Sequence, residues 1–373
     1  MNRLAPPDGL MLVCVLLLVT LSMVLVASAS LGISEVRYSD PLRVISHWAV
    51  YMPLGLLLMW FLSCIEVTWW QAMALPLLFI NLILMILVLI PGIGMEINGA
   101  RRWFSVSGIT LQPVELMKPA LILYMAHYMT AFPDRLKRFS SGLAPMLVML
   151  GIAIVLLLLQ PDFGNAALLF AVSICLWFVG GVPIAQLLSI LGIFIPIGLF
   201  IMVAEPYRMK RLLSFIDPWA DPLGSGYQLI QSMLAFGAGG LNGAGLGQGV
   251  QKLFYLPEPF TDFIAAVLAE ELGFIGVMAL MLLFMGLLGR GLQVVYSTNE
   301  QFSRLLVLGC VLLLGFSFII NMGAVMGILP TKGMPMPIIS YGGSALFGSF
   351  LLIGFIFSVQ RHQPSNRRKG VSA

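Results

Sequence analysis

Charged residues are scarce in this sequence. Asp, Glu, Lys and Arg make up 10% of its 373 residues, whereas the hydrophobic types make up 60%, and the mean hydropathy is +1.00. A soluble domain usually has about a quarter charged residues, so this composition excludes a soluble enzyme and indicates an integral membrane protein. The formal net charge is only +4 and the basic residues form no dense cluster, so we expect no nucleic-acid partner.

Cysteine and histidine are also few. The four cysteines lie far apart within apolar runs, and the three histidines have no metal-ligand spacing, which argues against a disulfide framework and leaves any metal site unknown. The glycine-rich stretch 237–249 contains neither GxxxxGK[ST] nor a strand-to-helix GxGxxG, so it does not predict a nucleotide site. We interpret its glycines as permissive backbone, for a bend or for close approach of a ligand.

Long apolar runs dominate the rest of the chain. Barrel strands would alternate in hydrophobicity over about 10 residues, so unbroken runs predict an all-α polytopic protein with about ten transmembrane helices. We treat 1–373 as a single membrane domain with one long extracytoplasmic loop, 205–262. The first run is interpreted as an uncleaved span, although Ala27-Ser28-Ala29 also fits a signal-peptide site. The predicted spans are 10–30, 47–65, 72–91, 112–131, 143–160, 165–182, 184–204, 263–289, 304–327 and 342–359.

The distribution of Lys and Arg predicts the orientation. Ten lie on the side that holds both termini and nine on the other, but four of those nine are in the long segment 205–262, which weighs less. Without those four, ten Lys and Arg lie on the side of the termini and five on the other. Because the cytoplasmic side carries the excess of Lys and Arg, we expect both termini in the cytoplasm. Cations left on the outer side, such as Arg101, Arg102 and Lys332, indicate an anionic ligand there.

Ionisable residues near or within the spans are candidates for function. Glu115 and Lys118 are three apart on one helix, so they share a face and could either neutralise each other or contact a ligand. Asp162 precedes a predicted helix, and N-capping is its favoured role.

Asp262 is the best candidate base in the sequence. It lies at the predicted start of the eighth helix, at the outer membrane face, although Asp262 or its neighbour Thr261 could equally serve as an N-cap. Glu270 and Glu271 follow about 12 Å deeper along the helix, too far to share a proton with Asp262. We interpret both as buried, hydrogen-bonded acids that fix helix packing.

Nine motifs occur in the same order as in one known family. Together they resemble the SEDS family (shape, elongation, division and sporulation) of bacterial peptidoglycan glycosyltransferases, over nearly the whole chain, and Leu329-Pro-Thr-Lys-Gly333 is closer to its cell-division branch than to its elongation branch. The family usually has His before the Thr-Asp pair, where this chain has Phe260. The motifs are Asn98-Gly-Ala-Arg-Arg-Trp103, Gln112-Pro-Val-Glu-Leu-Met-Lys118, Gln160-Pro-Asp-Phe-Gly164, Ala204-Glu-Pro-Tyr-Arg208, Asp221-Pro-Leu-Gly-Ser-Gly-Tyr-Gln228, Tyr255-Leu-Pro-Glu258, Thr261-Asp-Phe263, Glu270-Glu-Leu-Gly273 and Ser340-Tyr-Gly-Gly-Ser344.

The resemblance implies a reaction and a set of site residues. The substrate would be lipid II, a disaccharide-pentapeptide on undecaprenyl pyrophosphate, whose saccharide is polymerised into glycan strands during cell division with Asp262 as general base. A divalent cation, Mg²⁺ or Mn²⁺, could assist. The expected substrate-binding residues are Arg101, Arg102, Glu115, Lys118, Asp162, Arg208, Glu258 and Lys332.

The resemblance also implies partners and a location. A class B penicillin-binding protein would crosslink the glycan, with its membrane anchor packed against small residues such as Gly342, Gly343 and Gly348. Other division-complex membrane proteins and membrane lipid are further expected partners, in the bacterial cytoplasmic membrane at the division septum. A lipid II translocase without chemistry is the alternative function, and a non-catalytic scaffold is a third.

Overall fold

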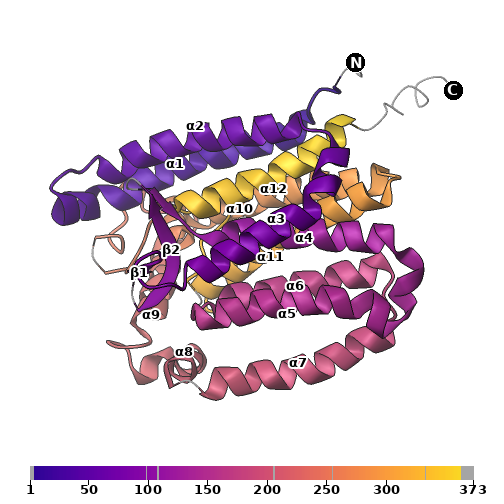
Figure 1. Cartoon of the computed structure of the whole chain (residues 1–373). Helices are drawn as coiled ribbons and strands as arrows, with labels where there is room; N and C mark the ends of the chain where they lie inside the picture. The colour runs from indigo at the N-terminus through magenta and orange to yellow at the C-terminus, as the bar shows by residue number, and fades with distance from the viewer. Residues whose placement is uncertain are drawn as a thin grey trace.

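The computed structural model describes residues 4–97, 99–106, 109–204, 206–253, 255–331 and 333–362. Ten long helices, lying side by side in Figure 1, coincide with the ten predicted spans within a few residues at most boundaries. The polytopic helical architecture is therefore confirmed. The ten are α1 (Gly9–Tyr38), α2 (Arg43–Ser63), α3 (Val67–Leu87), α4 (Pro113–Ala131), α5 (Ala144–Leu159), α6 (Phe163–Gly180), α7 (Ile184–Ala204), α10 (Ile264–Ser297), α11 (Gln301–Val325) and α12 (Gly343–His362).

The helix α4 differs from the others in its polarity. Among the described residues, nine helical segments are long and apolar enough to cross a membrane, and α4 is the long helix that falls below that hydropathy. It packs against α3, α5, α6, α11 and α12, and 13 of its 19 residues are buried. Because protein rather than lipid surrounds it, α4 can carry Glu115, Lys118 and His127. It continues through Pro119, which lies in its second turn.

Smaller elements gather at one end of the bundle. The antiparallel strands β1 (Met95–Ile97), β2 (Ala100–Val106) and β3 (Ile109–Leu111) link α3 to α4, which the all-α prediction did not include. The predicted loop 205–262 is partly helical: it contains α8 (Pro206–Ile216), the turn η3 (Pro218–Ala220) and α9 (Tyr227–Gly239). At the opposite end, η1 (Pro133–Lys137) and η2 (Phe139–Leu143) connect α4 to α5.

The beginning and the end of the described chain meet at one end of the bundle. The Ala5 amide donates to the Arg361 carbonyl at 3.0 Å, and Figure 1 shows the start of α1 and the end of α12 away from the sheet. This agrees with an even number of spans. The helix α12 lies inside the bundle rather than on its rim. A Cβ added at Gly348 would lie 2.7 Å from the Glu115 carboxylate and one at Gly343 would lie 3.2 Å from the Tyr51 ring. Gly348 therefore packs within this chain, and the prediction that it receives a partner's anchor is wrong. Gly342 and Gly343 are half-buried, and their contact with a partner's anchor stays a prediction.

The helix α10 is interrupted at Gly273, where φ is 64° and ψ is −162°. A break inside a membrane helix frees backbone groups that must find other partners. The glycine-rich segment supplies them: the amides of Phe274 and Ile275 donate to the carbonyls of residues 240 and 241, and the amides of residues 244 and 245 donate to the carbonyls of Glu270 and Glu271, at 2.9–3.2 Å. A Cβ at Gly243 would lie 2.2 Å from the Glu271 carbonyl oxygen. The permissive backbone predicted for 237–249 thus serves close approach to α10.

Candidate functional site

Asp262 lies two residues before α10 and is half-buried at the edge of a hollow of about 260 Å³. Phe263, Asn321, Val325, Gly333 and Met334 are among the other residues that line this hollow. The N-cap of α10 is Phe263, with no side-chain capping bond, so neither Asp262 nor Thr261 caps this helix. In the part of the chain that the structure describes, no group donates a hydrogen bond to the Asp262 carboxylate. Its oxygens are therefore available to another molecule.

The surroundings of Asp262 shift its acidity. Burial, first, and the negative charge of Glu258 raise the pKa of its carboxyl from 3.8 to about 6, against the guanidinium of Arg211 on α8, which acts in the opposite direction. A carboxylate with a pKa near 6 is still ionised at neutral pH and is a stronger base than an ordinary aspartate. The site thus provides a base that is ready to accept a proton.

Two neighbouring segments fix the backbone around Asp262. The Asn321 side-chain amide, 3% exposed on α11, donates to the Asp262 carbonyl at 2.9 Å and to the Met334 carbonyl at 2.7 Å. Two carbonyl acceptors require the NH₂ group on that side, so the Oδ1 atom of Asn321 points elsewhere; it has no partner among the described residues. Phe260 is buried edge-on against Tyr341 and its carbonyl accepts from the Tyr341 amide at 2.8 Å. Phe260 therefore serves as a packing residue here.

A second hollow of about 470 Å³ lies next to the first, because Met334 lines both. Glu115 and Lys118 line it and form the predicted pair, at 2.7 Å between Oε1 and Nζ, with side chains 7% and 13% exposed. Asn165 also lines it. Asp162 caps α6 as predicted, through the Asn165 amide at 3.1 Å, and it also accepts from the Asn165 side chain at 2.8 Å. Asp162 thus reaches this hollow through Asn165.

The predicted outer cations have different surroundings. Arg102 donates to the carbonyls of Gln160 and Pro161 at 2.7 and 2.5 Å, and so ties the sheet to the link between α5 and α6. Arg101 pairs with Glu96 at 3.0 Å on the strands. Lys332 lies outside the described residues, although Thr331 and Gly333 line the Asp262 hollow; Arg208 belongs to α8, and its side chain is not described.

Glu258 lies in an exposed turn before Asp262. Its carboxylate is 3.8 Å from the Arg37 guanidinium at the end of α1, and its φ is 51°. Arg211 is a cation that the motifs did not identify, although its charge reaches Asp262. The amphipathic sequence of α8, with basic residues at 208, 210 and 211, is the signal that could have indicated it.

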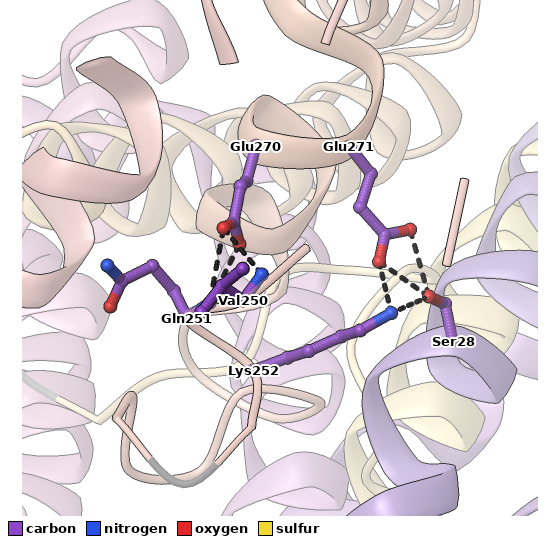
Figure 2. A network of polar contacts seen from close by, with 6 residues as sticks. All are labelled: Ser28, Val250, Gln251, Lys252, Glu270 and Glu271. Carbon is purple, nitrogen blue, oxygen red and sulfur yellow. Dashed lines mark hydrogen bonds and ion pairs between the residues drawn. The ribbon is translucent and has the colours of Figure 1, made fainter. Parts of the chain in front are cut away.

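A polar network joins α10 to the segment 250–252 and to Ser28 on α1 (Figure 2). Glu270 and Glu271 are buried and hydrogen-bonded, as predicted, but their partners lie mainly in the segment 250–252. Lys252, counted above among the outer loop cations, is 6% exposed and forms an ion pair with Glu271. It is not a surface charge.

Comparison with known proteins gives matches over nearly the full chain. Residues 8–365 match the family model of FtsW, RodA and SpoVE, described as cell cycle proteins. A probable peptidoglycan glycosyltransferase FtsW of Trichlorobacter lovleyi is 41% identical, covering 96% of this chain and 94% of that protein. Stage V sporulation protein E of Bacillus subtilis is 37% identical, covering 95% and 97%.

Solved structures show the same fold. A chain from a study of the structural coordination of polymerization and crosslinking by a peptidoglycan synthase complex matches with a TM-score of 0.80 and 32% identity, covering 96% of this chain and 99% of that one. The rod shape determining protein RodA of Thermus thermophilus matches with a TM-score of 0.70 and 28% identity, covering 96% and 98%. The chain therefore belongs to the SEDS family of FtsW, RodA and SpoVE proteins.

Proposed function

We propose that this chain polymerises lipid II into peptidoglycan glycan strands during cell division, with Asp262 as the general base. The observation that carries the proposal is the Asp262 carboxylate itself: it is half-buried beside a hollow, has a pKa near 6 and accepts no hydrogen bond from the described residues. The names of the full-length relatives, peptidoglycan glycosyltransferases of the FtsW type, support this activity.

The chemistry requires one base and a stabilised leaving group. The 4-hydroxyl of the acceptor sugar attacks the anomeric carbon of the donor, so that a new C–O bond forms while the bond from that carbon to the pyrophosphate oxygen breaks. The hydroxyl proton passes to the Asp262 carboxylate, and the polyprenyl pyrophosphate departs with the bonding electrons. Because pyrophosphate is a good leaving group, the reaction needs no paired acid of the kind that glycosidases use.

The polar residues around the two hollows would bind the substrate. Positive charge near the pyrophosphate stabilises the charge that develops on it, and Lys118, Arg102, Arg208 and Lys332 are our assignments for that role. Two of the five guanidinium donors of Arg102 contact carbonyl oxygens, which leaves others for phosphate. Glu115, Asp162, Arg101 and Glu258 would shape or hydrogen-bond the saccharide end of the substrate.

A divalent cation, Mg²⁺ or Mn²⁺, would neutralise pyrophosphate charge. Within the described ranges, no group of three or more His, Cys, Asp or Glu residues is arranged to hold a metal ion. The described part of the chain therefore does not supply a protein ligand set for a resident metal.

The partner and the location follow from the same assignment. The similar synthase-complex structure comes from work on polymerization and crosslinking, which supports a class B penicillin-binding protein as the crosslinking partner. We place the protein in the bacterial cytoplasmic membrane at the division septum, with other division-complex membrane proteins and with both termini in the cytoplasm. The sheet and Asp262 then face the outer surface.

Polymerisation of purified lipid II by the purified protein, with and without its transpeptidase, tests the proposal. We expect glycan strands from the native chain and none from Asp262→Asn. A translocase would tolerate this substitution, because asparagine keeps the shape and polarity of the side chain. Strand synthesis by Asp262→Asn at the native rate would therefore refute the base assignment, and lipid II movement without strands would refute the activity.

A further inference from the structure

The segment that leads to Asp262 is fastened to α10 by buried charges. Glu270, 3% exposed, accepts the backbone amide of Val250 at 2.7 Å and that of Gln251 at 3.1 Å through Oε1 (Figure 2). Both amides belong to a turn that follows the glycine-rich stretch. A single carboxylate thus satisfies two successive backbone donors of the loop, which fixes the orientation of that turn relative to α10.

Glu271, which follows Glu270 on α10, and Lys252, which follows Gln251 in the loop, make a second connection. Glu271 is fully buried, and its Oε1 lies 2.5 Å from the Nζ atom of Lys252, which is 6% exposed. Ser28 on α1 completes this part of the network: its hydroxyl lies 2.6 Å from Glu271 Oε1 and 2.7 Å from Lys252 Nζ. Figure 2 shows the two carboxylates side by side on α10, each directed toward the loop. Three consecutive loop residues are therefore held by two consecutive helix residues.

Packing alone does not explain this choice of residues. Burying a lysine and two carboxylates carries a desolvation cost that apolar residues of similar size would avoid, so such an arrangement is weak evidence for stability. Directional bonds to defined atoms nevertheless allow one register between two segments, whereas apolar contacts tolerate sliding. The break at Gly273 adds to this, because residues 240–245 are hydrogen-bonded to the same part of α10.

The fixed turn, 250–252, ends ten residues before Asp262. Asp262 itself lies two residues before α10. The segment 253–261 thus starts at a turn bonded to Glu270 and Glu271 and leads to the first residues of the same helix. Within it, the Leu256 amide donates to the Gln251 carbonyl at 2.8 Å, so the fixed turn continues into the segment. Displacement of 250–252 would move a short chain whose other end carries the Asp262 carboxylate.

We propose that Glu270, Glu271 and Lys252 are positioning residues: they hold the segment 249–262 in one register on α10 and thereby keep Asp262 directed into its hollow. The inference rests on the proposed role of Asp262, but the fixation of the segment can be measured without reference to that role. None of the three residues contacts the reacting atoms in this scheme.

The test compares the buried charge pair with an exposed charge pair of the same long connection, 205–262. Lys252→Met, Glu270→Ala and the double variant Lys252→Met/Glu271→Gln would be measured beside Lys210→Met, whose lysine forms an exposed 3.6 Å pair with Asp221. For each, lipid II polymerisation gives kcat and KM, thermal unfolding in detergent gives Tm, and hydrogen exchange reports the amides of 244–262. Glu270→Gln serves as the conservative variant, because its amide oxygen still accepts from the two loop amides.

A positioning role predicts a distinctive pattern. We expect Lys252→Met and Glu270→Ala to lower kcat at least about tenfold, with KM changing less than about threefold, since misplacing a reacting group by about 1 Å can lower the rate about 100-fold. Exchange in 249–262 should accelerate, Glu270→Gln should recover much of the rate, and Lys210→Met should match the native protein. The double variant removes the uncompensated buried charge, so its Tm should recover relative to Lys252→Met while its kcat stays low.

Two results would overturn the proposal. One is a kcat that rises together with Tm in the double variant, which would make the network merely structural. The other is faster exchange in 249–262 with native kcat, which would show that fixation of the segment is irrelevant to turnover. Failure of the assignment of Asp262 as the base would be distinguishable from failure of the positioning proposal. In that case Asp262→Asn alone would remain active, whatever the variants of Lys252, Glu270 and Glu271 do.

Discussion

The substitution Asp262→Asn should lower activity and raise stability together. Burial and the charge of Glu258 raise the pKa of Asp262 from 3.8 to about 6, so the folded state binds the proton more tightly than the unfolded state does. A shift of about two units corresponds to about 3 kcal/mol at most, and partial exposure of the side chain reduces this, so the ionised carboxylate destabilises the fold by about 1–3 kcal/mol at pH 7.5. Asparagine has no charge to desolvate. We therefore expect Asp262→Asn to increase the free energy of unfolding by that amount.

The raised pKa of Asp262 also determines how stability and activity depend on pH. Because the folded pKa is raised, stability falls as the pH rises between about 4 and 6, and it is level above that range. Base catalysis needs the ionised form, so kcat/KM should rise through the same interval and reach half its maximum near pH 6. In Asp262→Asn the pH dependence of unfolding in this interval should flatten, and polymerisation should fall at least about 100-fold.

Polymerisation of lipid II from pH 5 to 8 and thermal unfolding over the same range measure both effects. Asp221→Asn is a suitable control for removing a loop carboxylate, since the Asp221 side chain is 48% exposed and its partners are Ser225 in its own turn and Lys210 on α8. A lower stability for Asp262→Asn, or an activity that does not change between pH 5 and 7, would refute the link between burial, acidity and catalysis.

Substitutions at three further residues probe the walls of the two hollows. Gly333→Ala should lower kcat and destabilise the fold by about 1–2 kcal/mol, because φ is +61° and the new Cβ would lie 3.2 Å from Asp262 Oδ2. Steady-state kinetics and thermal unfolding measure the two effects, and an unchanged kcat would contradict the prediction. Asn321→Ala should destabilise by about 1–3 kcal/mol, since it leaves two carbonyls without their donor, and should also lower kcat; native turnover at reduced stability would limit Asn321 to a structural role. Lys118→Met should weaken lipid II binding and lower stability by about 3–5 kcal/mol, because it leaves Glu115 unpaired in the interior. Lys118→Arg should retain part of the binding and part of the stability. Lipid II binding and unfolding measured in parallel decide whether Lys118 contacts the ligand or only pairs with Glu115.

The sequence by itself determined where the long helices lie. Most of the spans show about 20 apolar residues in succession, which is a local property of the chain, so the ten helices were predicted at nearly their observed positions. Local spacing also predicted the Glu115–Lys118 pair, because residues three apart on a helix share a face. The preference of helix starts for Asp predicted the Asp162 cap. The nine motifs in family order identified the family, because short sequence motifs can be read directly from the chain.

Tertiary structure alone decided which distant polar groups meet. Lys252 looked like one more outer cation until the fold placed it against Glu271 and Ser28, two segments that are 19 and 224 residues away in the chain. Likewise, no local rule predicted that Asn321 would hold the Asp262 carbonyl, 59 residues earlier. In an interior of low polarity each buried polar group must find a partner, but which partner it finds depends on how the helices pack, and the hydrophobic pattern that specifies the helices leaves that packing open.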